Sequence, residues 1–366
     1  MTLSEPMLHG GDLISASTRY GIPVEQWLDL STGINPDSYP VGELDPAVFQ
    51  RLPYIQPAFA DAVSGYYGSD QWLAVNGSQP VIQALPEFLP DLPVMLPSAG
   101  YDEHRFHWAQ KGNDLMFYDA FDRTRAIEQI NAHINQNKPF HLMVINPNNP
   151  SGLRFQRDQL LQWVGRLPQG GYLIIDEAFI DIEPEHIVLF NEALPDNLIV
   201  LRSFGKFFGL AGLRLGFVFA ADSLRQKVQQ ALGIWQVNGV AQAIATDALA
   251  DRDWQRGARY EIAKNAAFTA ELLAPLAKVL EPLNEVQSGL FSHWRVTSER
   301  ASELQEQMAQ QGVLVRYIPL NDDEALIRFG IVSRFDWEGV NTLKRAIDVT
   351  VRSTSEKHEQ QSTAYG

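Results

Sequence analysis

Short apolar runs and amphipathic stretches alternate along the middle of the chain. The runs are rich in β-branched residues and are flanked by turn formers; they are WLAV, PVMLPS, HLMVIN, GYLIID, NLIVLRSF and LGFVFA. Between them lie helical patterns such as DRTRAIEQINAHIN, in which Ile127, Ile130 and Ile134 share one face. Another, DSLRQKVQQALG, is predicted to begin at an N-cap, Asp222, and to end at Gly233. This alternation predicts an α/β fold with a mostly parallel central sheet and helices on both faces.

The pattern changes after about residue 240. A long helical stretch, WQRGARYEIAKNAAFTAELLAPLAKVL, is followed by the strand-like runs FSHWRV and LIRFGIV, which indicates a smaller α+β domain. The first 40 residues are rich in Gly, Pro and Ser and indicate an irregular arm, whereas the last residues are polar. We therefore predict an arm over residues 1–40 that contributes to the small domain and the active site. A large domain over 41–238, a small domain over 239–352 and a disordered tail over 353–366 complete the prediction.

Composition narrows the classes of partner. The chain has 366 residues, 45% of them hydrophobic and 20% charged, with a net charge of −15 and a pI of about 4.9. An acidic chain repels phosphate backbones, so we expect no nucleic-acid partner, and a small anionic ligand needs a local basic site. No run of about 18 apolar residues and no secretory signal pattern are present, so we expect no membrane segment. Zero cysteines exclude thiol catalysis and fit a reducing compartment, which predicts a cytoplasmic protein.

Two polar stretches follow predicted strands and lead into turns or helices. In NGSQP, Gly77 permits an unusual backbone angle, while Ser78 and Gln79 offer donors at the start of a helix, where a phosphate binds well. In NPNNPSG, the prolines make a rigid turn that presents Asn149 at the sheet edge. Each stretch also has an ordinary interpretation, as a capped helix start or a plain loop.

Two charged groups follow further strands. Asp176 ends GYLIID like the magnesium-holding carboxylate of a P-loop ATPase, but the chain has no G-x-x-x-x-G-K-[ST] loop, and a surface carboxylate is the alternative. Lys206 lies among glycines and phenylalanines in LRSFGKFFGLAGLRLGF, where an amine is costly unless it is paired, neutralised or used chemically. His104 and His107 have a spacing that could hold a metal, but no H-E-x-x-H pattern accompanies them, so we predict structural histidines and no metal.

Together these strand-end features fit one cofactor, pyridoxal 5′-phosphate. This cofactor needs a lysine for its aldehyde, a carboxylate for its ring nitrogen and donors for its phosphate. The phosphate cradle, the amide, the carboxylate and the lysine occur in that order along the chain.

The ordered motifs resemble the fold-type-I pyridoxal-phosphate enzymes of the aspartate aminotransferase superfamily, and the resemblance spans nearly the whole chain. It implies that Lys206, in S-F-G-K, is the Schiff-base lysine and that Asp176 pairs with the pyridine nitrogen. It also implies that Asn149 hydrogen-bonds the phenolic oxygen and that Tyr101 stacks on the cofactor ring. The residues implied at the cofactor phosphate are Gly77, Ser78, Gln79, Ser203 and Arg214, with Tyr54 reaching the phosphate in the neighbouring subunit of a homodimer.

Within the superfamily, the chain is similar to the histidinol-phosphate aminotransferases and more closely to the threonine-phosphate decarboxylases of cobalamin synthesis. HGGDL resembles the N-terminal H-G-G-N, LSTGINP resembles D-F-S-x-x-I-N-P, and DEAFID carries Phe179 where many aminotransferases have a tyrosine. The implied substrate-binding residues are His9, Gly10, Asn35, Asn149, Arg316 and Arg328, the last of which grips the α-carboxylate with its planar fork. The implied reaction is decarboxylation of L-threonine O-3-phosphate to (R)-1-aminopropan-2-yl phosphate.

Three positions depart from the family pattern: Asp12 replaces an asparagine, Gly205 lies where a hydroxyl usually precedes the lysine, and Ala211 replaces a proline. Two alternatives to the decarboxylase stay open. An aminotransferase of the histidinol-phosphate type uses the same residues but breaks the Cα–H bond. A non-catalytic binding protein keeps the fold but predicts loss of Lys206 or Asp176, and both are present. We therefore expect an enzyme, a carbon–carbon lyase.

Overall fold

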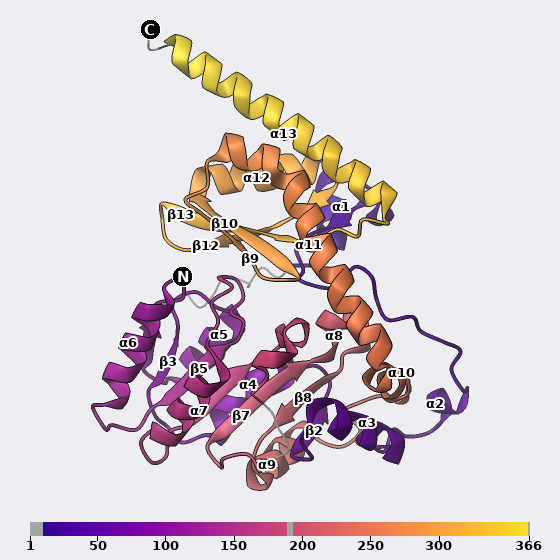
Figure 1. The fold of residues 1–366 in the computed structure, drawn as a ribbon, viewed down its shortest axis with the longest axis vertical. Helices are drawn as coiled ribbons and strands as arrows, with labels where there is room; N and C mark the ends of the chain where they lie inside the picture. Colours follow the sequence, from indigo (N-terminus) through magenta and orange to yellow (C-terminus); the bar gives the residue numbers. More distant parts are fainter. Residues whose placement is uncertain (1–9, 189–192, 365–366) are drawn as a thin grey trace. The chain divides into compact units, whose positions relative to one another are not determined.

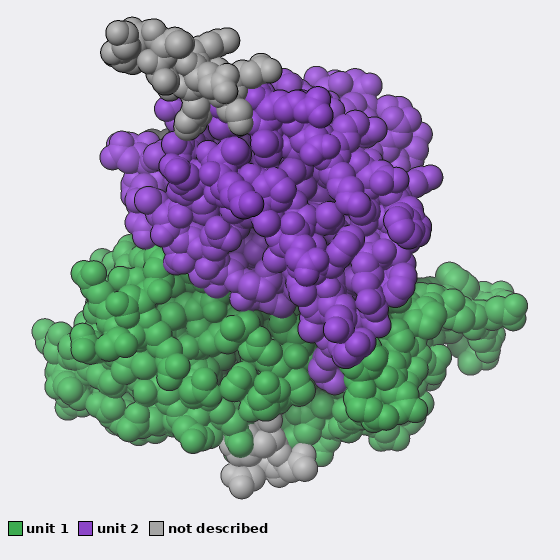
Figure 2. All heavy atoms as spheres, turned by 45° about the horizontal axis from the view of Figure 1, so that its top comes forward, with its two compact units in different colours: residues 1–3, 38–257 green, residues 4–37, 258–366 purple. Residues whose placement is uncertain are grey.

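The computed structural model describes residues 10–188 and 193–364, which divide into two compact units (Figure 2). Of the described residues, unit 1 contains 38–257, and unit 2 contains 10–37 together with 258–364. One long helix, α11 (Arg252–Leu280), crosses the boundary between the two ranges. Each unit has its own sheet, and each is described separately below.

Unit 1 contains a seven-stranded sheet in the order β2-β8-β7-β6-β5-β3-β4 (Figure 1). Only β8 runs against its neighbours, so the sheet is mostly parallel, as predicted. The six strands expected from the apolar runs are all present, and β4 is an additional strand. The strands are β2 (Trp72–Val75), β3 (Val94–Pro97), β4 (Leu115–Tyr118), β5 (His141–Ile145), β6 (Leu173–Asp176), β7 (Leu198–Ser203) and β8 (Gly216–Phe219).

Helices lie on both sides of this sheet, as Figure 1 shows. Buried side chains of α4, α5 and α9 form one apolar cluster with the strands, because every strand in the middle of the sheet carries apolar residues on that face. The helices of unit 1 are α2 (Ala47–Gln50), α3 (Pro57–Tyr67), α4 (Gln79–Phe88), α5 (Asp102–Lys111), α6 (Arg123–Ile134), α7 (Arg157–Arg166), α8 (Phe204–Phe207), α9 (Asp222–Leu232) and α10 (Gly239–Ala250). Short 3-10 helices are η2 (Ile180–Ile182), η3 (Pro184–His186) and η4 (Ala211–Leu213).

Unit 2 is built on an antiparallel four-stranded sheet in the order β12-β13-β10-β9, with a separate parallel pair, β1 and β11. Leucines of α11 and apolar residues of α12 and α13 pack with this sheet into a second core. The strands are β1 (Leu28–Asp29), β9 (Asn284–Gln287), β10 (Phe291–Thr297), β11 (Val313–Leu314), β12 (Arg316–Pro319) and β13 (Glu324–Gly330). The helices are α1 (Leu13–Tyr20), η1 (Val24–Gln26), α12 (Ser298–Gln310) and α13 (Trp337–Ala364).

Four local expectations differ from the structure. The N-terminal arm is not irregular throughout, because Asp12 caps α1 by accepting a hydrogen bond from the Ser15 N–H at 3.0 Å. The expected disordered tail from residue 353 is instead helical as far as Ala364, where α13 ends. The N-cap of α9 is Ala221, and Asp222 is the first helical residue. Helix α10 belongs to unit 1, so the division falls after residue 257 and not after 238.

Candidate active site

The topology of the unit 1 sheet brings most predicted cofactor residues to one edge. The carboxyl ends of parallel strands meet at the same edge, and ligands bind there in open α/β sheets. Asp176 is the last residue of β6 and Ser203 the last residue of β7. Gly216 begins the antiparallel strand β8 and lies opposite both Val75 at the end of β2 and Ser203. The segments that follow β2 and precede β8 therefore meet beside Ser203.

A close approach of two backbone segments forms a cradle at this edge. Gly77 has φ +75°, and a Cβ added to it would lie 2.7 Å from the Arg214 guanidinium. A Cβ on Gly216 would lie 2.7 Å from the Ser78 nitrogen. Ser78 is the N-cap of α4, whose first N–H groups have no partner within the helix and attract anions. These residues fit a phosphate group, because the glycines let an arginine and a helix N-terminus converge without side chains between them.

Arg214 is itself held in an uncommon conformation. Its φ is 53°, in the left-handed region that few residues other than glycine adopt. Its side chain is exposed, and Nη1 donates a hydrogen bond to the carbonyl of Ala211 at 3.3 Å. Strained residues of this kind cluster at binding sites, which agrees with its predicted phosphate contact.

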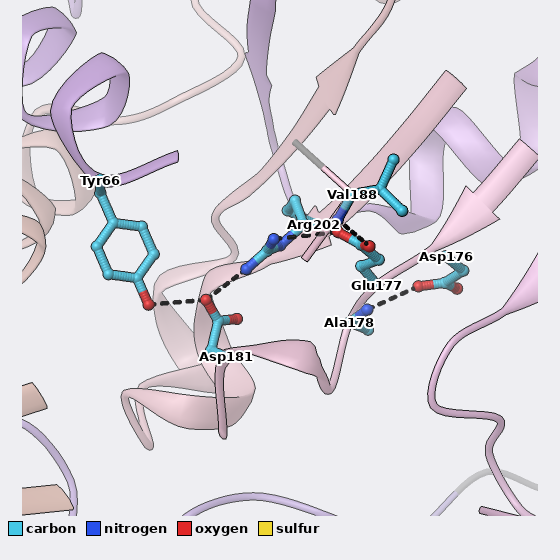
Figure 3. Close-up of polar contacts among 7 residues, drawn as sticks. All are labelled: Tyr66, Asp176, Glu177, Ala178, Asp181, Val188 and Arg202. Atoms are coloured by element: carbon cyan, nitrogen blue, oxygen red, sulfur yellow. Dashed lines mark hydrogen bonds and ion pairs between the residues drawn. The ribbon is translucent and has the colours of Figure 1, made fainter. Parts of the chain in front are cut away.

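Asp176 is a buried carboxylate held on both oxygens. Oδ1 accepts a hydrogen bond from the Ala178 N–H at 3.0 Å, as Figure 3 shows, and Oδ2 lies 2.9 Å from His104 Nε2. His104 is 2% exposed and lies in the first turn of α5. The sequence pattern predicted a structural role for His104, whereas the structure places it against the predicted catalytic carboxylate. The available sequence signal was the position of His104 three residues after Tyr101, just beyond a strand.

Lys206 extends from a short helix that is anchored in the core. Phe204 and Phe207 flank it on α8 and are both buried, whereas Lys206 is half-buried. Its Nζ lies 5.6 Å from the centre of the Phe179 ring, and Phe179 follows Asp176 by three residues. The lysine and the carboxylate therefore emerge from adjacent strands, since Asp176 pairs with Leu201 of β7.

The loop after β5 is fixed by its other asparagines. Asn146 Oδ1 accepts a hydrogen bond from the Phe155 N–H at 2.9 Å. Asn148 Nδ2 donates to the carbonyl of Ala99, in the loop after β3, at 2.8 Å. Both asparagines are buried, while Asn149 is half-buried. The turn is thus held rigidly from inside, and Asn149 is the member that lies nearest to solvent.

Gln79 and Tyr101 contact each other in this unit. The Tyr101 hydroxyl donates a hydrogen bond to Gln79 Oε1 at 3.0 Å, and Gln79 Nε2 donates to Glu103. The amide of Gln79 therefore has protein partners at both ends, and its backbone N–H, at the first position of α4, is the donor that suits a phosphate. No motif in the sequence indicates a role for Glu103.

Tyr54 has a different setting. It is 65% exposed in the segment between α2 and α3, and its ring meets that of Trp235 edge to face at 6.1 Å. The predicted role of Tyr54 concerns a neighbouring subunit.

Four of the predicted substrate-binding residues lie in unit 2, whereas Asn149 lies in unit 1. Arg316 on β12 and Arg328 on β13 are directly opposite each other in the sheet. Arg328 is buried and donates a hydrogen bond to the Ser31 carbonyl. Burial and the adjacent Arg316 lower the pKa of the Arg328 guanidinium to about 10, against an opposing effect of Asp29. Two like charges at this position favour an anionic partner.

Gly10 and Asn35, the described N-terminal members of this set, lie in the same unit. A Cβ on Gly10 would lie 2.5 Å from the Ser31 carbonyl oxygen, so the chain passes close to the segment that Arg328 contacts. Asn35 is buried, and its side chain bonds the backbone N–H and carbonyl of Asp37 at 3.1 and 2.9 Å. His9 lies outside the described residues.

The chain belongs to the class I and II aminotransferases, whose family pattern matches residues 43–340. It is similar to the threonine-phosphate decarboxylase of Pseudomonas aeruginosa, with 37% identity over 324 residues that cover 88% of this chain and 92% of the relative. It is 36% identical to the threonine-phosphate decarboxylase of a Sinorhizobium species over 321 residues, 86% of this chain and 90% of the relative. The histidinol-phosphate aminotransferase of Clostridium novyi is 25% identical over 75% of this chain and 76% of the relative.

Solved structures show the same fold at lower identity. The histidinol-phosphate aminotransferase of Sinorhizobium meliloti, in complex with pyridoxal 5′-phosphate, has a TM-score of 0.72 and 19% identity, covering 96% of this chain and 97% of that one. The L-threonine-O-3-phosphate decarboxylase of Porphyromonas gingivalis has a TM-score of 0.65 and 20% identity, covering 88% and 99%. These likenesses confirm the predicted fold class. Among the described residues, no helix has the length and apolar character needed to cross a membrane.

Proposed function

We propose that this protein is a pyridoxal-phosphate-dependent lyase that decarboxylates L-threonine O-3-phosphate to (R)-1-aminopropan-2-yl phosphate in cobalamin synthesis. Two relatives that are more than a third identical over most of the chain are named threonine-phosphate decarboxylases. The observation that carries the proposal is the convergence of the Gly77–Arg214 cradle, the buried Asp176 and Lys206 at one edge of the unit 1 sheet.

The cofactor would be held by residues of unit 1. Ser78, the first N–H groups of α4, Ser203 and Arg214 would bind its phosphate, because the strand ends and the close approach at Gly77 and Gly216 bring them to one edge of the sheet. The carboxylate of Asp176 would hold a proton at the pyridine nitrogen, where a negative partner favours the charged ring. Tyr101 would stack on the ring and Asn149 would donate to its phenolic oxygen. We further propose that unit 1 is the cofactor domain and that unit 2 supplies substrate contacts.

Bound pyridoxal phosphate supplies an electron sink conjugated to the substrate Cα. The chain's own task is to choose which bond to Cα breaks and to handle protons. Lys206 Nζ would hold the cofactor by its aldehyde, and as a free amine it would carry the proton that Cα takes up after carbon dioxide is lost. Hydrogen bonds to both oxygens of Asp176 hold its carboxylate in one orientation. A carboxylate fixed in this way is preorganised to stabilise the protonated pyridine nitrogen.

Substrate recognition would come from Arg316 and Arg328. Threonine phosphate carries a carboxylate and a phosphate, and two adjacent guanidiniums suit a ligand with two anionic groups. An arginine that binds the departing carboxylate stabilises the ground state and opposes its loss. Binding the substrate phosphate strongly can offset this effect, because remote binding energy can orient the carboxylate for cleavage.

The proposal includes a homodimer and a cytoplasmic location. Exposed apolar residues of unit 1, including Tyr54, support an interface between two copies. A chain without cysteine gains nothing from an oxidising compartment, which supports the location.

Product analysis tests the reaction. Purified protein with pyridoxal phosphate is incubated with threonine phosphate, with and without 2-oxoglutarate, and carbon dioxide and amino transfer are measured. We expect carbon dioxide in amounts equal to the amine phosphate, independent of 2-oxoglutarate. Keto acid formed without carbon dioxide would instead identify an aminotransferase of the histidinol-phosphate type.

Replacing the lysine tests the site. In Lys206→Ala, turnover should fall by at least about 10²–10⁴-fold, the range for a positioned acid–base group. Circular dichroism in the far ultraviolet should be unchanged, because Lys206 is half-buried and its neighbours on α8 hold the helix in the core. Substantial activity in this variant would contradict the assignment.

A further inference from the structure

Glu103 is a buried carboxylate close to residues of the candidate cofactor site. Asp176 is the carboxylate proposed to pair with the cofactor, so Glu103 has no role yet. It is 5% exposed and lies in the first turn of α5. A negative charge near a phosphate cradle opposes phosphate binding, and burying a carboxylate is costly unless hydrogen bonds compensate. The contacts of Glu103 therefore need a reason of their own.

Those contacts form a chain of side chains that links α5 with the start of α4. His107 Nε2, one turn further along α5, lies 3.0 Å from Glu103 Oε2. The same carboxylate accepts a hydrogen bond from Gln79 Nε2, and Gln79 Oε1 accepts one from the Tyr101 hydroxyl at 3.0 Å. Gln79 is the first residue of α4, beside the cradle.

The donors and acceptors in this row of side chains determine which way the Gln79 amide points. An ionised carboxylate only accepts hydrogen bonds, so Gln79 must turn its NH₂ group to Glu103 and its oxygen to Tyr101. With the amide reversed, two acceptors would face each other at Glu103, and the Tyr101 hydroxyl would face an NH₂ group. Glu103 thus leaves a single acceptor for the Tyr101 hydroxyl, in one place.

We propose that Glu103, oriented by His107, is a positioning residue for the cofactor site: through Gln79 it fixes the Tyr101 ring and the first turn of α4. The inference rests on the proposed function, since it concerns the ring that would stack on the cofactor and the helix N-terminus that would meet its phosphate. Glu103 acts through Gln79 and has no contact with the reacting atoms in this scheme.

The variants separate hydrogen bonding from charge. Glu103→Ala removes the acceptor for Gln79, whereas Glu103→Gln keeps an acceptor oxygen of the same shape. Glu87→Ala is the matched control, because Glu87 lies on α4, its side chain is 60% exposed, and it pairs with Lys111 of α5. It removes a carboxylate from the same two helices without touching the chain of contacts.

The readouts are the dissociation constant of pyridoxal phosphate from the protein and the visible ellipticity of the bound cofactor, which reports a ring held in one orientation. In Glu103→Ala we expect about 10-fold weaker binding, the effect of one lost hydrogen-bond linkage, and reduced ellipticity. Glu103→Gln should stay close to wild type, and Glu87→Ala should match it. A loss in Glu103→Gln as large as in Glu103→Ala would overturn the inference.

A second variant covers the case in which Glu103→Ala does not fold. Tyr101→Phe breaks the chain at its other end while leaving the buried carboxylate in place, and it should reduce the ellipticity in the same way. Wild-type affinity and ellipticity in Glu103→Ala, or wild-type ellipticity in Tyr101→Phe, would overturn the inference. Failure of the wild-type protein to bind pyridoxal phosphate would instead overturn the proposed function, and the inference with it.

Discussion

Gly205, which precedes the candidate lysine, is explained by a contact with the next turn of the chain. A Cβ at position 205 would lie 2.6 Å from the Ala211 Cα and 3.1 Å from its nitrogen, both backbone atoms. The family pattern has a hydroxyl residue at 205, but here η4 approaches too closely for any side chain. The departures at 205 and 211 are therefore two sides of one contact.

The substitution Gly205→Ser tests this contact. Because the serine Cβ meets backbone atoms, η4 must shift, and we expect the free energy of unfolding to fall by about 1–3 kcal/mol, the usual cost of overpacking. Urea unfolding of the cofactor-free protein measures the change. Gly212→Ser is the control, since a Cβ at Gly212 in the same segment meets no atom within 4 Å. Equal stability of the two variants would contradict the explanation.

Single residues divide into those whose role follows from local sequence and those whose role depends on a distant partner. Asp176 and Ser203 end apolar strands, so their place at the sheet edge follows from the alternation of strands and helices. The partner of Asp176 is His104, which is 72 residues away, and Gln79 meets Glu103 across 24 residues. Such pairs depend on how α5 packs against the sheet and against α4, which a single sequence does not specify.

At the scale of elements, a buried ionic cluster joins the ends of β6 and β7. Arg202 Nη1 lies 3.1 Å from Glu177, and Nη2 pairs with Asp181, which also accepts a hydrogen bond from the Tyr66 hydroxyl at 2.7 Å (Figure 3). The Val188 N–H donates to Glu177 at 3.0 Å. Because Glu177 follows Asp176 and Arg202 precedes Ser203, this cluster fixes two strand ends that carry site residues.

The cluster predicts a pH dependence of stability. Burial raises the pKa of Glu177 from 4.5 to about 7, and the attraction of Arg202 only partly opposes this, because two carboxylates share one guanidinium. Between pH 4.5 and 7, Glu177 is protonated in the folded state but ionised in the unfolded state. Its contribution to the free energy of unfolding is therefore full below about pH 4.5 and is lost as the pH rises to 7. Within this window the free energy of unfolding falls by at most about 1.4 kcal/mol per pH unit because of Glu177.

Glu177→Gln isolates that contribution. Urea unfolding at pH 5, 6, 7 and 8 should show wild-type stability declining relative to the variant as pH rises through the window, and the variant should lack this component. Glu185→Gln serves as control, because the Glu185 side chain, in the neighbouring η3, is 66% exposed. Parallel pH curves for wild type and Glu177→Gln would contradict the raised pKa.

Element boundaries were predictable only where local signals determine them. All six apolar runs became strands, because a strand buried on both faces of the sheet needs a continuous apolar stretch. Helix α10 was assigned to the smaller domain from its composition, yet the Gln242 side chain in α10 accepts a hydrogen bond from the Gln56 N–H and donates one to the Pro53 carbonyl. Those partners lie about 190 positions earlier, so periodicity could not reveal them. Helix α1 in the arm was not predicted either, because Thr18 and other polar residues interrupt its apolar pattern.

At the scale of the whole molecule, net charge and local charge have opposite signs. The chain carries −15, so a ligand with phosphate and carboxylate groups is repelled at long range and must be bound by local cations. Unit 2 places Arg316 opposite Arg328, and unit 1 places Arg214 against Gly77. The need for basic sites followed from composition, but the pairing of Arg316 with Arg328 depends on the register of β12 and β13.

An exposed apolar patch in unit 1 predicts self-association. We define the patch as Phe49, Leu52, Tyr54, Ile55, Ile234 and Trp235, which are 42–67% exposed. The Tyr54–Trp235 contact joins its two segments. Large exposed apolar residues gathered in this way mark interfaces, and their burial supplies most of the association energy.

The double substitution Phe49→Asp/Leu52→Asp should convert the proposed dimer into a monomer. Two charges in the patch would have to be buried on association, so we expect the dissociation constant of the dimer to rise by about 100-fold or more. Sedimentation velocity over a range of protein concentrations measures it. Phe335→Asp is the control, because Phe335 is 63% exposed but lies outside the patch. If Tyr54 completes the partner's phosphate site, this variant should bind pyridoxal phosphate more weakly as well, because losing the dimer removes Tyr54 from that site. A variant that stays dimeric would place the interface elsewhere, and a monomer with unchanged cofactor affinity would remove Tyr54 from the site.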